Sequence, residues 1–186
     1  MNRMIVVIAI ALCVMAVSAL PAAAEEEQYA ATIMVVGGVG SGSTGSVDIW
    51  IDKYSTNEEA VELATLLAEK GQDALRLALE KLDAGRMSID NEGVIPIAVA
   101  RSLTGGDKRI IRIFIARNIL FLEHFEMTRT RDYPFSIIEM QVNEKGEGEG
   151  AAIAAAKLRF DAKAQQFVVE SYGQGTNLKL VNVRRW

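Results

Sequence analysis

Residues 109–116 (RIIRIFIA) decide the fold class, because this segment is apolar on both faces of an extended strand. A strand that is buried on both faces lies between two layers, or between a barrel wall and a covering helix. We therefore expect a sheet that carries a second layer of structure.

The chain after Gly85 consists of short strand candidates separated by turn signals. Connections this short cannot carry parallel crossovers, so we predict an antiparallel meander. Residues 151–157 are rich in alanine, but glycines precede them and a turn follows them, which favours a strand. Pro96 indicates a strand at the edge of the sheet. The predicted strands are residues 86–90, 93–102, 108–116, 118–125, 134–143, 150–160, 166–172 and 177–185.

Before Gly85, strands at residues 28–36 and 46–53 form a predicted hairpin around a glycine-rich loop. After residue 53 the spacing of the apolar residues changes from every second residue to the 3.6-residue period of a helix. Ser55 and Glu58 fit a capping box that opens a helix over residues 57–70, and Gly71 ends it. Asp73 is placed to cap a second helix over residues 74–82, so a two-helix hairpin (57–82) is expected over one face or end of the sheet.

These elements define a mainly β (α+β) fold, an antiparallel meander that forms a curved sheet or a partly closed barrel. Residues 1–24 have the features of a signal peptide: Arg3, an apolar run over residues 5–20, and an alanine cleavage site at residues 22–24. The sequence thus predicts one β-rich domain at residues 25–186, in a periplasmic or secreted protein without a transmembrane span.

Charge and cysteine content exclude several classes of function. Loss of residues 1–24 removes Arg3 and no acid, which changes the formal net charge from -4 to -5. Such a charge argues against a nucleic-acid-binding surface and against a polybasic membrane-binding patch. The single cysteine, Cys13, lies within the predicted signal, so the domain forms no disulfide.

Motifs for chemistry are few. Residues 40–45 (GSGSTG) fit a dinucleotide fingerprint, but a strand follows where that fingerprint needs a helix. His124 is the only histidine, and Glu126 alone shares its strand face, which is too few ligands for zinc. Residues 143–150 are interpreted as an acidic turn, with adventitious calcium as a minor alternative. We therefore predict neither a metal nor a cofactor, and no catalytic residue is assigned.

The segment of residues 128–134 (TRTRDYP) contains the candidate ligand-binding residues Arg129, Arg131 and Tyr133. Arginine binds carboxylates and phosphates through two parallel hydrogen bonds. The alternative, which we favour, is an internal pair with Asp132 that holds a long connection.

Several segments are familiar together: residues 132–139 (DYPFSIIE), the 146–150 turn (GEGEG), the ending 180–185 (LVNVRR), 37–40 (GGVG) and 71–75 (GQDAL). On these segments the chain resembles a family of uncharacterised exported bacterial proteins. The resemblance implies a signal peptide and a β-rich domain, and it implies no activity, ligand or catalytic residue.

Three hypotheses of function follow. The preferred one is a non-enzymatic exported domain that binds a small, mainly apolar molecule or a protein partner, since ligand sites occur in the mouths of barrels. The second is a hydrolase of envelope polymers that uses two carboxylates, one of them with a raised pKa. The third is a structural or scaffolding role, which requires an exposed apolar patch or an unpaired edge strand.

Overall fold

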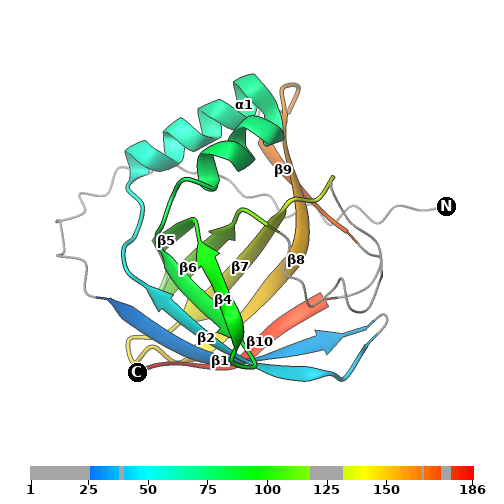
Figure 1. Cartoon of the computed structure of the whole chain (residues 1–186). Helices are drawn as coiled ribbons and strands as arrows, with labels where there is room; N and C mark the ends of the chain where they lie inside the picture. Colours follow the sequence, from blue (N-terminus) through cyan, green and yellow to red (C-terminus); the bar gives the residue numbers. More distant parts are fainter. Residues whose placement is uncertain (1–25, 38–39, 118–131, 165, 173–176) are drawn as a thin grey trace.

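The computed structural model describes residues 26–37, 40–117, 132–164, 166–172 and 177–186 (Figure 1). The predicted mainly β class is confirmed. Within these residues the structure has one helix, α1 (Asn57–Leu79), and the strands β1 (Glu27–Val36), β2 (Thr44–Ile51), β3 (Gly85–Ile89), β4 (Glu92–Ile97), β5 (Val99–Gly105), β6 (Lys108–Ile115), β7 (Phe135–Val142), β8 (Gly148–Asp161), β9 (Gln166–Ser171) and β10 (Asn177–Arg185). The candidate strand at residues 118–125, with His124, lies outside the described residues.

All strands belong to one antiparallel sheet that curls into a half-barrel. Nine of them follow the order β4-β3-β2-β1-β10-β8-β7-β6-β5, and β9 pairs with β8. The predicted hairpin is β1 and β2, in which Tyr29 lies opposite Ile49. The alanine-rich stretch is part of β8, which confirms a strand there.

The prediction of a single strand at residues 93–102 is wrong, because the structure has two strands there. β4 pairs with β3 and β5 pairs with β6, so one segment supplies both ends of the strand order. Ala98 lies between them, and its N–H donates to the carbonyl of Phe114 at 3.0 Å. The change of partner at Ala98 brings the two ends of the sheet together. Pro96 lies in β4, an end strand, as predicted.

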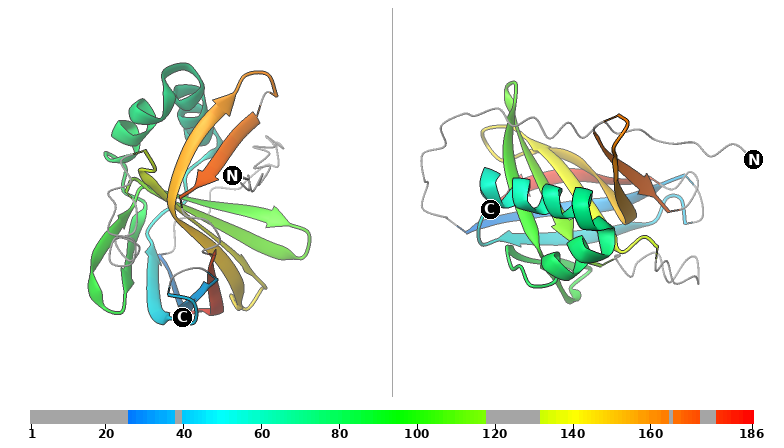
Figure 2. Two further views of the ribbon diagram at one scale, coloured as in Figure 1. Left: turned by 90° about the vertical axis from the view of Figure 1, so that its right-hand side faces the viewer. Right: turned by 90° about the horizontal axis from the view of Figure 1, so that it is seen from above.

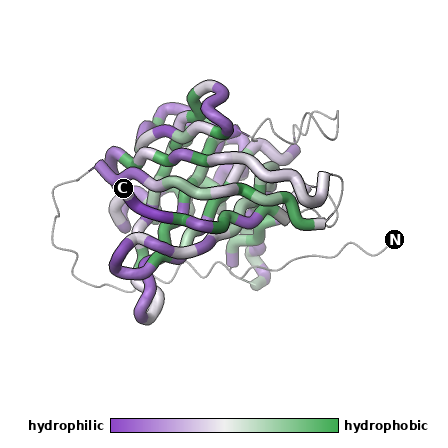
Figure 3. The backbone as a smooth tube through the Cα atoms, turned by 90° about the horizontal axis from the view of Figure 1, so that it is seen from below, coloured by the Kyte–Doolittle hydropathy of each residue, from purple (hydrophilic) through white to green (hydrophobic). Residues whose placement is uncertain are grey.

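An inner core occupies the concave face of the sheet. Because its residues come from strands far apart in the strand order, the sheet must curl around them. Hydrophobic residues lie along the strands and many hydrophilic ones at the turns (Figure 3). The largest fully buried side chains of this inner core are Tyr29, Ile49, Ile51, Met87, Ile97, Ile111, Ile113, Ile115, Ile138, Met140 and Leu180.

A second core lies between α1 and the outer face of the sheet. Leu67, Leu75 and Leu79 of α1 pack there against strand residues that include Phe135 and Leu158. The helix crosses over the strands when the molecule is seen from above (Figure 2). Since Ile113 belongs to the inner core and Phe114 packs against the second core, β6 is covered on both faces, as its sequence predicts.

The predicted two-helix hairpin is wrong, because one kinked helix takes its place. Gly71 alone leaves helical geometry, with φ 77° and ψ -177°. This backbone conformation is open essentially to glycine only, and it redirects the helix without a connecting loop. The helix ends at Leu79 and does not extend to Leu82. None of the described helices is long and apolar enough to cross a membrane.

The helix begins at Asn57 as predicted, but its N-cap is Thr56 and not Ser55. The N–H of Ser55 donates to the carbonyl of Ala100 at 2.8 Å, which holds Ser55 against β5. Thr56 is the N-cap instead. Its hydroxyl accepts from the N–H of Glu59 at 3.2 Å, and its own N–H donates to the Glu59 carboxylate at 2.8 Å. Tertiary contact therefore selects between two adjacent capping boxes.

Replacing Thr56 with alanine is expected to lower the free energy of unfolding by about 1 kcal/mol, because it removes the cap. Ser55→Ala is the matched control and is expected to change that free energy by less than about 0.5 kcal/mol. Urea denaturation followed by circular dichroism measures both. A larger effect of Ser55→Ala would place the cap at Ser55.

Candidate functional site

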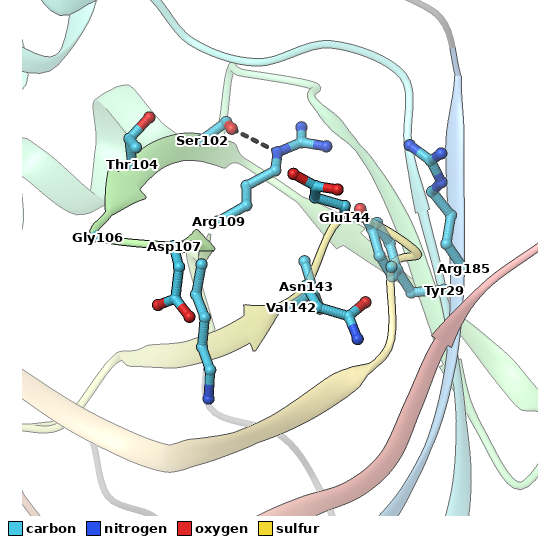
Figure 4. Close-up of a pocket in the computed structure, with 12 residues that line it drawn as sticks. Tyr29, Ser102, Thr104, Gly106, Asp107, Arg109, Val142, Asn143, Glu144 and Arg185 are labelled. Carbon is cyan, nitrogen blue, oxygen red and sulfur yellow. Dashed lines mark hydrogen bonds between the residues drawn. The ribbon is translucent and has the colours of Figure 1, made fainter.

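A cavity of about 430 Å³ opens at one end of the half-barrel, and we call it the mouth cavity (Figure 4). It lies where β1 begins, where β10 ends, and where the β5–β6 and β7–β8 turns meet. Tyr29 and Val142 belong to the inner core and also line the cavity, so they separate it from the packed interior. The other lining residues are Ser102, Thr104, Gly106, Asp107, Lys108, Arg109, Asn143, Glu144, Gly146 and Arg185.

Glu27 organises the charged groups beside the mouth cavity. One carboxylate oxygen accepts from the hydroxyls of Tyr29 (2.8 Å) and Tyr54 (2.6 Å). The other accepts from Nη1 of Arg109 at 2.7 Å and lies 3.7 Å from Nη1 of Arg185. Only 15% of the Glu27 side chain is exposed. A carboxylate that is paired in this way is a structural counter-ion, since both of its oxygens are occupied.

The ionisation states follow from this network. Burial acts to raise the pKa of Glu27, but the hydrogen bonds from Arg109, Tyr54 and Tyr29 outweigh it, and the pKa lies below its usual value. Burial and the hydrogen bond to Glu27 raise the pKa of Tyr29 to about 12, and the same causes raise that of Tyr54. Glu27 is therefore ionised and both phenols are protonated at neutral pH.

Arg109 is held by three neighbouring side chains, and one nitrogen of its guanidinium remains available to a ligand. Its Nε donates to the hydroxyl of Ser102 at 2.7 Å, its Nη1 is bound to Glu27, and the guanidinium lies 4.9 Å from the ring centre of Tyr54. Nη2 has no hydrogen-bond partner among the described residues. Arginine presents donors in a fixed planar fork, so this arrangement offers a preorganised donor to a bound acid group.

The lining carries charges of both signs. Lys108, Arg109 and Arg185 are cationic, and Asp107 and Glu144 are acidic. In Figure 4, Arg109 and Glu144 lie between Arg185 on one side and Asp107 on the other. Such a lining suits a polar molecule that has an acid group and further hydroxyl or amino groups.

Of the three ligand-binding residues predicted from the sequence, only Tyr133 is among the described residues, and it does not line this cavity. Arg129 and Arg131 lie outside the described residues. Tyr133 packs edge to face on Tyr172, with ring centres 5.3 Å apart, and does not line the mouth cavity.

The sequence analysis did not identify this site, although the sequence contains a pattern that points to it. By alternation, Arg109 shares a strand face with Ile111 and Ile113, and Glu27 shares one with Tyr29. A charge on an inward-facing row needs a partner of opposite sign. Two inward-facing rows that end in opposite charges predict an ion pair, but only the strand order together with the curl of the sheet tells which rows meet.

No protein-family model, no curated protein sequence and no solved structure matches this chain. No group of three or more histidine, cysteine, aspartate or glutamate side chains is placed to hold a metal ion in the described part of the chain.

Proposed function

We propose that this chain is an exported, non-enzymatic binding domain that takes up a small acid-bearing molecule in the mouth cavity. The observation that carries the proposal is Arg109, which Glu27, Ser102 and Tyr54 hold at the cavity with one guanidinium nitrogen left to bind a ligand. A cavity of about 430 Å³ is within the size range of small-molecule sites.

The charged lining favours a polar ligand over the mainly apolar one that the sequence suggested. A carboxylate or phosphate would lie between Arg109 and Arg185, with Lys108 adding charge. Ligand hydroxyl or amino groups would then donate to Asp107 and Glu144. Preorganisation lowers the entropy that binding must overcome, because Arg109 is already ordered.

A hydrolase that uses two carboxylates is the second candidate, since Asp107 and Glu144 line the same cavity. That mechanism needs one carboxyl with a raised pKa. Binding is the better supported of the two, because Arg109 is already held at the cavity with one guanidinium nitrogen left for a ligand.

The test is isothermal titration calorimetry with phosphate, succinate and glutamate as probes. We expect saturable binding of at least one probe and about tenfold weaker binding in Arg185→Ala, which loses one charged contact. Arg185 is 44% exposed in its side chain and lies 3.7 Å from Glu27, so the variant is expected to fold.

Arg159→Ala is the matched control. Arg159 has a similar side-chain exposure, 45%, and also pairs with a glutamate, Glu170, but it does not line the mouth cavity. Its probe affinity is expected to equal that of the wild type. Absence of binding for every probe, or equal affinity in Arg185→Ala, would reject the proposal. Turnover of a glycan that Glu144→Gln abolishes would favour the hydrolase.

A further inference from the structure

Both tryptophans of the chain lie in one row across the sheet. The register pairs Trp50 of β2 with Gln28 of β1 on one side and with Arg86 of β3 on the other. The N–H of Trp186 donates to the carbonyl of Gln28 at 3.1 Å, so Trp186 continues the row beyond β10. We call these four residues the tryptophan row.

The tryptophan row faces away from the inner core. Tyr29, Ile49 and Met87 are the strand neighbours of Gln28, Trp50 and Arg86, and all three are buried in that core. Successive side chains of a strand point to opposite faces. The same alternation directs Trp186 outward, since Arg185 before it lines the mouth cavity. Trp186 is 77% exposed and Trp50 is partly exposed.

The row combines flat apolar rings with balanced charge. The guanidinium of Arg86 lies 5.1 Å from the ring centre of Trp50 and 3.9 Å from the carboxylate of Glu26. Trp186 and Trp50 are two strands apart, which places their backbones about 10 Å from each other. Gln28 lies between them, with an amide that both donates and accepts.

We propose that the tryptophan row binds an uncharged oligosaccharide or polysaccharide chain. Sugar rings present flat C–H faces that pack on aromatic rings, and hydroxyl rims that bond to groups such as Gln28, Arg86 and Glu26. Because Arg86 and Glu26 are paired, the row offers no net charge to a charged polymer. The acidic chain, with a formal net charge of -4, disfavours an anionic lipid surface. The site is separate from the mouth cavity, because the two lie on opposite faces of the sheet.

The test uses chitohexaose and cellohexaose, two uncharged β-linked glycans, as probes. Because both tryptophans lie in the row, saturable binding is expected to change the intrinsic tryptophan fluorescence of the wild type. Calorimetry is expected to show about tenfold weaker binding in Trp186→Ala, since one stacking surface is lost, and nearly full affinity in Trp186→Phe.

Leu77→Ala is the matched control for loss of an exposed apolar side chain. Leu77 is 52% exposed and lies on α1, so its variant is expected to bind the glycans like the wild type. Arg185→Ala is also expected to leave glycan affinity unchanged, which separates this proposal from the mouth cavity. Failure of both glycans to bind would overturn the proposal. The proposal would also be overturned if the wild type bound phosphatidylglycerol vesicles, or associated with itself, instead of binding the glycans, and if Trp186→Ala abolished that interaction.

Discussion

Replacing Gly85 with alanine is expected to lower the free energy of unfolding by about 3 to 5 kcal/mol. Gly85 opens β3 with φ 144°, which L residues rarely adopt, and a Cβ there would lie 2.1 Å from the carbonyl oxygen of Trp50. That oxygen is backbone of the paired strand, so relief requires β2 and β3 to separate. Their shared inner-core residues, Ile51 and Met87, would then lose contact. Urea denaturation measures the change.

Gly93→Ala is the matched control for this substitution. Gly93 also has a positive φ, 69°, but a Cβ there meets nothing within 4 Å. Its expected cost is therefore only the backbone strain, about 1 kcal/mol. Equal losses in the two variants would mean that contact with Trp50 does not limit the stability of the β2–β3 pair.

Replacing Glu27 with glutamine is expected to lower the free energy of unfolding by about 2 to 4 kcal/mol, because it removes a largely buried carboxylate that has four partners. Arg109 and Arg185 lose their shared carboxylate, and the hydroxyls of Tyr29 and Tyr54 lose a charged acceptor. Glu139→Gln is the control, since Glu139 pairs with Arg112 at 2.6 Å but is 34% exposed. Its expected cost is under about 1 kcal/mol. If the two variants lost similar free energies of unfolding, the burial of Glu27 would not strengthen its contribution to stability.

The same network predicts a pH dependence. The pKa of Glu27 is lowered in the folded state, so its contribution is complete above the ordinary value of 4.5 and is lost as the pH falls through the folded pKa. Wild type and Glu27→Gln should therefore converge in stability in acid. The pKa of Tyr29 is raised from 10.0 to about 12, so its contribution is complete below 10 and is lost as the pH rises through 12. A gap in stability that does not change with pH would contradict this account.

Local patterns predicted the strands well and the helix less well. Alternation identified β2, and a run that is apolar on both faces identified β6. Glycines with a following turn placed residues 151–157 in a strand despite their alanines. The prediction for the helical region was wrong in detail, because tertiary contacts and the backbone conformation of one glycine determine where the helix is capped and how it bends. Ser55 bonds to the backbone of β5, which moves the cap to Thr56, and Gly71 bends one helix where its sequence suggests two.

The site was harder to predict because its residues are distant in sequence. Glu27 and Arg109 are 82 positions apart, and nothing local to either identifies the other. The sequence instead favoured residues 128–134, where two arginines are adjacent to an aspartate and a tyrosine. The signal peptide at residues 1–24 lies outside the described residues and stays a prediction.

Periodicity and loop length are enough to predict the mainly β class, the antiparallel pairing and the double burial of β6. The division of β4 from β5 at Ala98, and the meeting of side-chain rows at the mouth cavity, depend on contacts between distant segments. A strand's own residues specify which of its faces is apolar, but not which strand it pairs with. The strand order placed Trp50 in one row with Trp186, and the curl of the sheet brought Glu27 of β1 to Arg109 of β6, which β10, β8 and β7 separate from β1 in that order.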